Sequence, residues 1–320
     1  MKRVFTSQFK EPIERLIEQK HALGFPYDES QRVLFNFDQF CLKNFPQETE
    51  LTQEIGFTWA QRKPSENNNG FRNRLMPVRE LARYLNRIGI AAYVIPVDLA
   101  KKGARYMPHI YTREELSALF AVLDQTPYKR NFPVRHLVIP VIFRLIYCCG
   151  LRPSEARKLK VQHVDLGIGR LHILESKGHK DRVVMLSDDV LALCQQYHEQ
   201  VRSLLPDSEY FFPDSNGKMY TKDWIIKTFR IVRAKAGMQH SGGTTCRVYD
   251  FRHTFATNRL YLWMKEGKDL TACLSYLSAY MGHAQLSDTA YYIHLVPEFF
   301  PQMAQMDMGK FERLIPEVEQ

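Results

Sequence analysis

Cysteine is scarce in this sequence, and long apolar runs are missing. The six cysteines form no CxxC pair and show no spacing typical of a metal site or a disulfide framework. No run of about 18 apolar residues occurs, and the N-terminus has no apolar stretch of signal-peptide length. Internal repeats and low-complexity tracts are also missing. These absences argue against a disulfide-rich secreted protein and a membrane protein. They predict a soluble, cytoplasmic chain in a reducing compartment.

Acidic residues are fewer than basic ones. The 320 residues contain 35 Asp and Glu against 44 Lys and Arg, which gives a formal net charge of +9. A basic protein of this kind favours polyanions as partners, but the basic residues are spread along the chain and meet only through folding. Because 45% of the residues are hydrophobic, the chain can bury a sizeable core, and its length predicts about two domains.

The first 100 residues read as a helical domain. Helices are expected over 11–24, 31–45, 52–63 and 71–89. In the last of these, apolar residues recur every three or four positions and form one stripe. The other face carries a row of arginines, and two interpretations stay open: contact with a phosphate backbone, or a solvated helix face. These arginines are Arg72, Arg74, Arg79, Arg83 and Arg87.

A linker over residues 101–111 and a second domain over 112–320 follow. Thr112 and Glu115 have the spacing of a helix capping box, which marks the start of this domain. An apolar helix is expected over 133–150, then a β-hairpin from 169–176 and 181–186, and further helices over 188–205, 222–237, 249–265, 269–282 and 299–314. The predicted fold is mainly α with a small antiparallel β-sheet.

Three basic residues are candidates for binding an anion. Arg152 follows a helix-ending glycine and opens the next helix, so its guanidinium faces either a phosphate or an internal partner such as Glu155 or a carbonyl. Arg252 lies on a helix that is otherwise apolar, and its charge needs an internal carboxylate or a ligand anion. Lys177 lies at the hairpin, with Lys180 and Arg182 as nearby competitors, although lysines at such tips are usually only solvated.

Four motifs in this order resemble the catalytic domain of the tyrosine site-specific recombinases, the phage integrase family. They are GLRPSEARKL at 150–159, SKGHKDRVVML at 176–186, YDFRHTFATNRL at 249–260 and MGHAQLSDTAYYIH at 281–294. The resemblance covers roughly 112–300, and the helical block before it resembles the family's core-binding domain. By this resemblance, the active site consists of Arg152, Lys177, Arg252, His283 and Tyr292.

The resemblance implies a DNA recombinase without a metal or cofactor. Tyr292 would form a 3′-phosphotyrosyl bond with double-stranded DNA, and a homotetramer would exchange strands through a Holliday junction. No small-molecule substrate and no membrane partner are implied. The segment 299–314 would pack on a neighbouring protomer in the family, or else on its own domain. Tyr291 is expected to be packing.

One position departs from the family. Three residues before Arg252 the family most often has histidine, whereas this chain has Tyr249. A phenol with an ordinary pKa of about 10 donates hydrogen bonds but is a poor base at neutral pH. Tyr249 is therefore a candidate site residue of altered chemistry, with either the scissile phosphate or His283 taking the proton. His253 is expected to be structural, because it lies about 100° round the helix from Arg252.

Three other functions stay open at this point. A type IB topoisomerase uses the same chemistry to relax any supercoiled plasmid. A catalytically weakened DNA-binding regulator would form no covalent DNA complex, and Tyr249 keeps this alternative alive. A basic helical interaction module without DNA function would require the four spaced motifs to be a coincidence.

Overall fold

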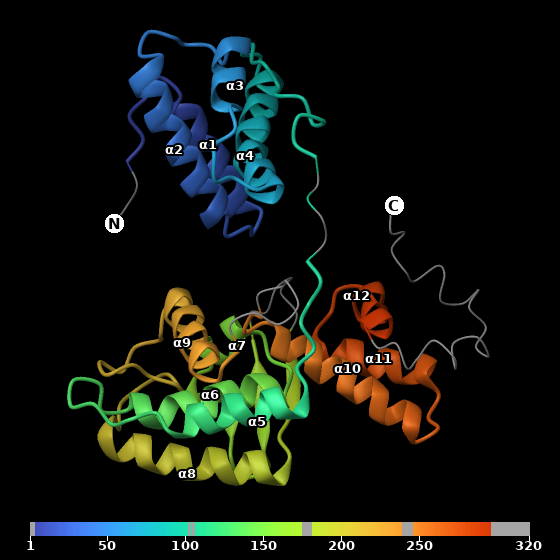
Figure 1. Ribbon diagram of the computed structural model, residues 1–320. Coiled ribbons are helices and arrows are strands. Elements are labelled where there is room, and N and C mark those ends of the chain that lie inside the picture. The colour runs from blue at the N-terminus through green and yellow to red at the C-terminus, as the bar shows by residue number, and fades with distance from the viewer. Residues whose placement is uncertain (1–3, 102, 104–105, 175–180, 239–245, 296–320) are drawn as a thin grey trace. The chain divides into compact units, whose positions relative to one another are not determined.

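A computed structural model describes residues 4–101, 103, 106–174, 181–238 and 246–295. The chain divides into two compact units, Met1–Tyr106 and Met107–Gln320 (Figure 1). Each unit has its own hydrophobic core. The predicted segments that carry Lys177 and residues 299–314 lie outside the described residues.

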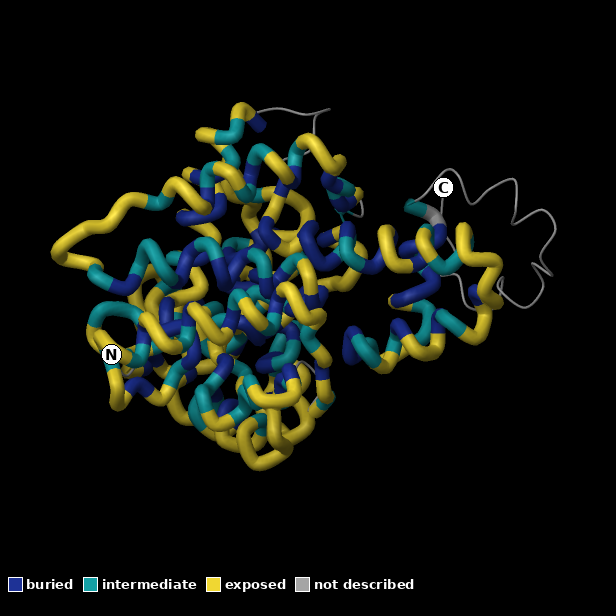
Figure 2. The backbone as a smooth tube through the Cα atoms, turned by 90° about the horizontal axis from the view of Figure 1, so that it is seen from below, coloured by how far each residue is buried: buried dark blue, intermediate teal, exposed yellow. Residues whose placement is uncertain are grey.

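Four helices build the described part of the first unit, as predicted: α1 (Lys10–Ala22), α2 (Asp28–Asn44), α3 (Gln53–Trp59) and α4 (Asn68–Arg87). The last two begin at side-chain caps, because Thr52 accepts the N–H of Ile55 and Asn67 accepts the N–H of Gly70. Helix α4 packs against α1 and α2 through its apolar stripe. In Figure 2, buried and exposed positions alternate along the helices, as expected for amphipathic helices.

The prediction that the arginines of α4 lie on its outer face is wrong for two of them. Arg74 is buried, pairs with Glu66 at 2.7 Å and lies over the ring of Trp59. Arg79 is also buried and donates hydrogen bonds to the carbonyls of Ile95 and Pro96. These two side chains face inward because α4 buries a wider face than its apolar residues alone define. Arg83 and Arg87 are exposed, as the pattern predicts.

The stretch after α4 packs on the first unit for part of its length. Ala92 bridges to Leu51, and Ile95 and Ala100 are buried in the first core. Tyr111, by contrast, is buried in the second core, where its N–H donates to Thr254 Oγ1 at 3.0 Å. The part of the chain that connects the two cores therefore falls between residues 100 and 111.

The second unit is mainly helical. The capping box predicted at Thr112 and Glu115 is confirmed at the start of α5. The long helices are α5 (Arg113–Asp124), α6 (Arg135–Cys148), α8 (Asp188–Leu204), α9 (Lys222–Lys235), α10 (Asp250–Lys265) and α11 (Leu270–Met281). The short ones are α7 (Pro153–Lys158), η1 (Val161–His163), α12 (Ser287–Ala290) and η2 (Tyr291–Leu295).

A three-stranded antiparallel sheet of order β1-β2-β3 completes this unit. Strand β1 (Val164–Asp165) pairs with β2 (Arg170–Ile173), and β2 pairs with β3 (Arg182–Met185). The register places Ile173 opposite Arg182. The predicted fold, mainly α with a small antiparallel sheet, is confirmed.

Helix α6 lies at the centre of the second core, because both its apolar composition and its neighbours bury it. It packs against α5, α8 and α10. A smaller apolar cluster joins α10, α11 and η2, and it contains Leu260, Leu274 and Tyr292. Across the described ranges, no helix combines the length and the apolar character needed to cross a membrane.

Candidate active site

Two helix ends with the same geometry frame the site. Helix α6 ends before Gly150, which has a positive φ of 57°, and the next N–H, from Leu151, returns to the carbonyl of Ile146. A Cβ at position 150 would lie 2.5 Å from the ring of Phe255, so only glycine fits. This turn places Arg152 directly before α7.

Helix α11 ends in the same way at Gly282, whose φ is 64°. The N–H of His283 returns to the carbonyl of Ser278 at 3.0 Å. Backbone carbonyls at such a helix end carry the partial negative charge of the helix dipole, so they attract cations. The carbonyls of Met281 and Gly282 each accept a hydrogen bond from an arginine.

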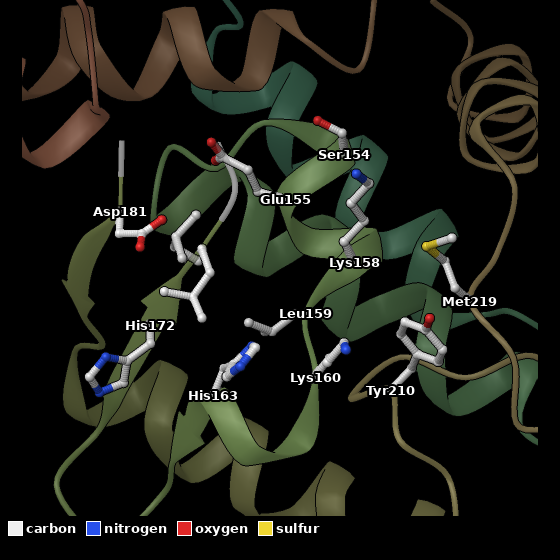
Figure 3. Close-up of a pocket in the computed structure, with 12 residues that line it drawn as sticks. Ser154, Glu155, Lys158, Leu159, Lys160, His163, His172, Asp181, Tyr210 and Met219 are labelled. Atoms are coloured by element: carbon white, nitrogen blue, oxygen red, sulfur yellow. The ribbon is translucent and has the colours of Figure 1, made fainter. Parts of the chain in front are cut away.

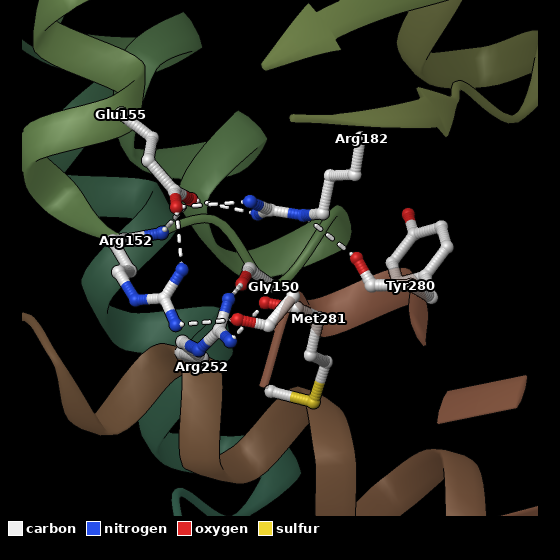
Figure 4. A network of polar contacts seen from close by, with 8 residues as sticks. Gly150, Arg152, Glu155, Arg182, Arg252, Tyr280 and Met281 are labelled. Carbon is white, nitrogen blue, oxygen red and sulfur yellow. Dashed lines mark hydrogen bonds and ion pairs between the residues drawn. The ribbon is translucent and has the colours of Figure 1, made fainter. Parts of the chain in front are cut away.

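Arg252 is the central cation. It is fully buried, at 0% exposure, and it donates to the carbonyl of Gly150 at 2.6 Å and to that of Met281 (Figure 4). The sequence predicted an internal carboxylate or a ligand anion as the partner of this charge, whereas the structure provides the backbone carbonyls of two helix ends. Burial lowers the pKa of Arg252, but a guanidinium stays protonated in proteins.

Arg152 lies beside Arg252 and is bound on two sides. Its Nη1 donates to Glu155 at 2.7 Å, and its Nη2 donates to the carbonyl of Gly282 at 3.0 Å. Both internal partners that the sequence allowed, Glu155 and a carbonyl, are thus present. These contacts use two of the five N–H groups of a guanidinium, so Arg152 keeps donors for a further anion.

His283 is a neutral histidine at physiological pH. Burial, followed by the charges of Arg252, Arg152 and Arg182, lowers its pKa from 6.5 to about 3. Its Nδ1 shares a hydrogen bond of 2.7 Å with the hydroxyl of Thr289 on α12. Its ring stacks on that of Tyr292, with centroids 5.9 Å apart.

Tyr292 lies on η2 and is 3% exposed. Burial raises the pKa of its phenol to about 12, and the nearby Arg252 opposes this rise. The phenol is therefore protonated at neutral pH. Tyr291 is half-buried and packs against the same apolar cluster, in line with its expected packing role.

His253 lies at the site, although it was expected to be structural. Its ring centroid is 5.3 Å from that of Tyr249 and 5.5 Å from that of Tyr292. Tyr249 stands at the start of α10 and is 39% exposed. The sequence did carry a signal, because residues 249 and 253 are four apart and share one helix face.

The structure thus brings five of the six predicted site residues together in one chain. The rings of His283 and Tyr292 stack, Arg152 and Arg252 act on the pKa values of both, and Tyr249 lies close enough to act on those of Arg152, Arg252 and Tyr292. The sixth, Lys177, lies outside the described residues. Arg182, the competitor of Lys177 that the structure describes, has its side chain buried against Glu155.

Two cavities border this site. One, of about 490 Å³, is lined by Arg152 and Tyr249 together with apolar side chains of α9. Its described lining includes no carboxylate, and its other cations are Arg157, Lys222, Arg230, Arg233 and Arg247. The other, of about 540 Å³, is lined by residues of both charges, among them Glu155, Lys158 and Asp181 (Figure 3). The first cavity is the better match for a polyanion.

Comparison with known proteins identifies the chain. Residues 110–298 match the phage integrase family. The chain belongs to this family, the tyrosine site-specific recombinases. The putative integrase/recombinase y4rB of Sinorhizobium fredii is 29% identical over 92% of this chain and 96% of its own length. The tyrosine recombinase XerC of Staphylococcus carnosus is 30% identical over 61% of this chain and 60% of its own length.

Solved structures share the fold. The recombinase XerH bound to its palindromic difH substrate has a TM-score of 0.64 at 20% identity, over 94% of this chain and 84% of that one. A lambda integrase tetramer bound to a Holliday junction has a TM-score of 0.62 at 12% identity, over 88% of this chain and 76% of that one. The recombinase is an enzyme that breaks and rejoins DNA in site-specific recombination, and the topoisomerase alternative is not favoured.

Proposed function

We propose that Tyr292 is the nucleophile of this recombinase and that Arg152 and Arg252 hold the scissile phosphate. The observation that carries this proposal is the packing of the Tyr292 phenol among His283, Arg252 and Arg152, all from one chain. Because a single chain supplies both the tyrosine and the arginines, each protomer cleaves the strand that it binds itself.

The two arginines suit a phosphodiester in complementary ways. Each uses one N–H on each Nη nitrogen for internal carbonyl or carboxylate contacts, which fixes the direction of the guanidinium. The remaining donors can bind the nonbridging oxygens and stabilise the charge of a pentacoordinate transition state. His283, which burial and then these same cations keep neutral, donates a hydrogen bond to the phosphate without adding a charge.

The proton of Tyr292 goes to His253 in this mechanism. Tyr249 is a phenol and a poor base at neutral pH. His283 has a pKa of about 3 and its Nδ1 is bonded to Thr289, so it is a weak acceptor. The ring of His253 contacts those of both Tyr249 and Tyr292, which favours it as the base. Tyr249 then serves as a hydrogen-bond donor beside Arg152.

Cleavage and rejoining need no external energy source. Tyr292 Oη bonds to phosphorus as the bond to the 5′ oxygen breaks, and Lys177 gives that oxygen its proton. The 5′-hydroxyl of another strand then attacks the phosphotyrosine and releases Tyr292. Because one phosphoester replaces another, two such exchanges pass through a Holliday junction without ATP, a metal or another cofactor.

We infer that the partner is double-stranded DNA bound by a homotetramer. The similar structures include XerH on a DNA substrate and lambda integrase as a tetramer on a Holliday junction. In this chain, the cationic cavity next to Arg152 and the exposed arginines of α4 suit a phosphate backbone. Residues 1–100 would serve as the core-binding domain, 101–111 as the linker and 112–320 as the catalytic domain.

We propose that the segment 299–314 packs on a neighbouring protomer of the same tetramer. The alternative is that it packs on its own domain. Removing the residues after 300 is expected to abolish assembly on DNA and to leave binding to a single site, as measured by gel shift. Intact synapsis by the truncated chain would reject the docking between protomers.

Covalent trapping tests the proposed nucleophile. A nicked duplex from the DNA that flanks the gene is incubated with the wild-type chain and with the Tyr292→Phe and Tyr291→Phe variants. Wild type and Tyr291→Phe should form a covalent protein–DNA complex, and Tyr292→Phe should form none. A complex with Tyr292→Phe would reject the assignment. No complex with wild type, on any flanking segment, would favour the DNA-binding regulator.

A further inference from the structure

A third arginine, Arg182, lies behind the two proposed phosphate ligands. It is the first residue of β3, and its side chain is 6% exposed. Its guanidinium binds both oxygens of Glu155, at 2.9 and 2.7 Å, in the paired geometry that makes arginine–carboxylate contacts strong (Figure 4). Its Nε donates to the carbonyl of Tyr280 at 2.8 Å. The hydrogen bonds of this side chain to Glu155 and to Tyr280 therefore both lead toward the site.

The last turn of α11 connects all three arginines. The carbonyl of Tyr280 accepts from Arg182, that of Met281 from Arg252, and that of Gly282 from Arg152. Arg182 also fills the space beside Gly282, where an added Cβ would lie 3.1 Å from its Cδ. The guanidinium of Arg182 thus fixes the turn from which His283 projects.

Glu155 connects Arg182 to Arg152 directly. Its side chain is 4% exposed, and its carboxylate accepts from Arg182, from Arg152 Nη1 and from the N–H of Arg152. Burial alone would raise the pKa of this carboxyl, but Arg182, followed by Arg152, lowers it to about 2. Glu155 is therefore an anion that two cations share.

Because Arg182 and Arg152 share the carboxylate of Glu155, the contact with Arg182 determines how much of the positive charge of Arg152 is available to a phosphate. With Arg182 present, Glu155 is already neutralised by a paired contact, and Arg152 retains its positive charge for an external anion. Without Arg182, the buried carboxylate has Arg152 as its remaining cation among these three residues. Because an unpaired buried carboxylate is costly, Arg152 would then turn toward Glu155 and away from a phosphate.

We infer that Arg182 is a positioning residue for catalysis: it neutralises Glu155 and clamps the end of α11, and so keeps Arg152 directed at the scissile phosphate. This role rests on the proposed function, in which Arg152 binds that phosphate. It differs from a merely structural ion pair in one respect. If Arg182 acts by neutralising Glu155, removal of the Glu155 charge must compensate for the loss of Arg182.

Charge compensation can be measured with four variants. They are Arg182→Met, which keeps the side-chain length but removes the charge, Arg182→Lys, Glu155→Gln, and the double variant Arg182→Met with Glu155→Gln. Arg170→Met is the matched control, because Arg170 lies on β2 of the same sheet and is about 40% exposed. Circular dichroism and thermal denaturation establish that each variant is folded.

Single-turnover formation of the covalent complex on the nicked flanking duplex is the first measurement. Arg182→Met should slow it by about 100-fold, the effect of misplacing a reacting group by about 1 Å. The double variant should recover at least about 10-fold of this loss, and Arg182→Lys should lie between wild type and Arg182→Met. Arg170→Met should react within about twofold of wild type.

Titration with inorganic phosphate is the second measurement, and it reports the availability of Arg152 without DNA chemistry. Arg182→Met should weaken phosphate binding about 10-fold, and the double variant should restore it, while Arg152→Ala should lose it. A double variant no better than Arg182→Met in both assays would overturn the inference, as would wild-type behaviour of Arg182→Met. If wild type forms no covalent complex, the proposed function fails, and the phosphate titration still decides the role of Arg182.

Discussion

The depressed pKa of His283 predicts a defined loss of stability in mild acid. Burial and the charges of Arg252, Arg152 and Arg182, with His253 nearby, hold the folded-state pKa at about 3, against 6.5 in an unfolded chain. The unfolded state therefore takes up a proton first as the pH falls. The stability from a neutral His283 is fully present above pH 6.5 and is lost progressively toward pH 3.

The size of this effect follows from linkage. A pH of 5 lies about 1.5 units below the ordinary pKa of an unfolded histidine, and each unit corresponds to about 1.36 kcal/mol of free energy. The free energy of unfolding should therefore fall by about 2 kcal/mol between pH 7.5 and 5 because of His283 alone. Glu155, with a pKa of about 2, stays ionised in the folded state throughout this range and adds little.

Urea denaturation at both pH values measures the loss in wild type and in His283→Asn. Asparagine retains a polar group near Thr289 but does not titrate. Tryptophan fluorescence reports the unfolding, since Trp263 packs against the cluster that contains Tyr292. The wild-type stability should drop by about 2 kcal/mol more than that of the variant. An equal decrease in the free energy of unfolding of both proteins would refute the claim that burial and the neighbouring arginines lower the pKa of His283.

Three further predictions, made with four substitutions, test other parts of the structure. Gly282→Ala should destabilise the protein by about 1–2 kcal/mol in thermal denaturation, because the φ of 64° at residue 282 is unfavourable for alanine and the new methyl group would press on Arg182. Unchanged stability would contradict the described turn. Arg79→Met should lower the free energy of unfolding by about 1–3 kcal/mol, since buried carbonyls lose their donor. The exposed Arg83→Met should change it by less than about 0.5 kcal/mol, and equal effects of the two substitutions on the melting temperature would contradict the described difference in burial. His253→Gln should slow covalent-complex formation about 100-fold at pH 7 and remove the acidic limb of its pH–rate profile. An unaltered profile would mean that the phosphate or His283, and not His253, accepts the proton of Tyr292.

Periodicity predicts most helices of this chain because burial of one apolar face is a local pattern. Turn chemistry is equally local, so the capping box at Thr112 and the glycine after α6 were readable from the sequence. The hairpin was predictable for the same reason, from two short β-rich runs around polar residues. These features require no knowledge of what packs against them.

Long-range polar partners are not predictable in this way. Arg74 and Arg79 resemble surface residues in the sequence, but distant carbonyls and a carboxylate hold them inside. In the sequence, Arg182 is one of several basic residues near the hairpin, and only the fold places Glu155 and Tyr280 beside it. The contact of His253 with Tyr292 joins residues that are 39 positions apart in the printed sequence, so only the fold could bring it to light.

A crystal structure of the trapped covalent complex is the most direct measurement of the central proposal. It should show the phosphate bonded to Tyr292 Oη, with nonbridging oxygens within about 3.2 Å of guanidinium nitrogens of both Arg152 and Arg252. A phosphate bonded to another residue, or one that neither guanidinium reaches, would contradict the proposal.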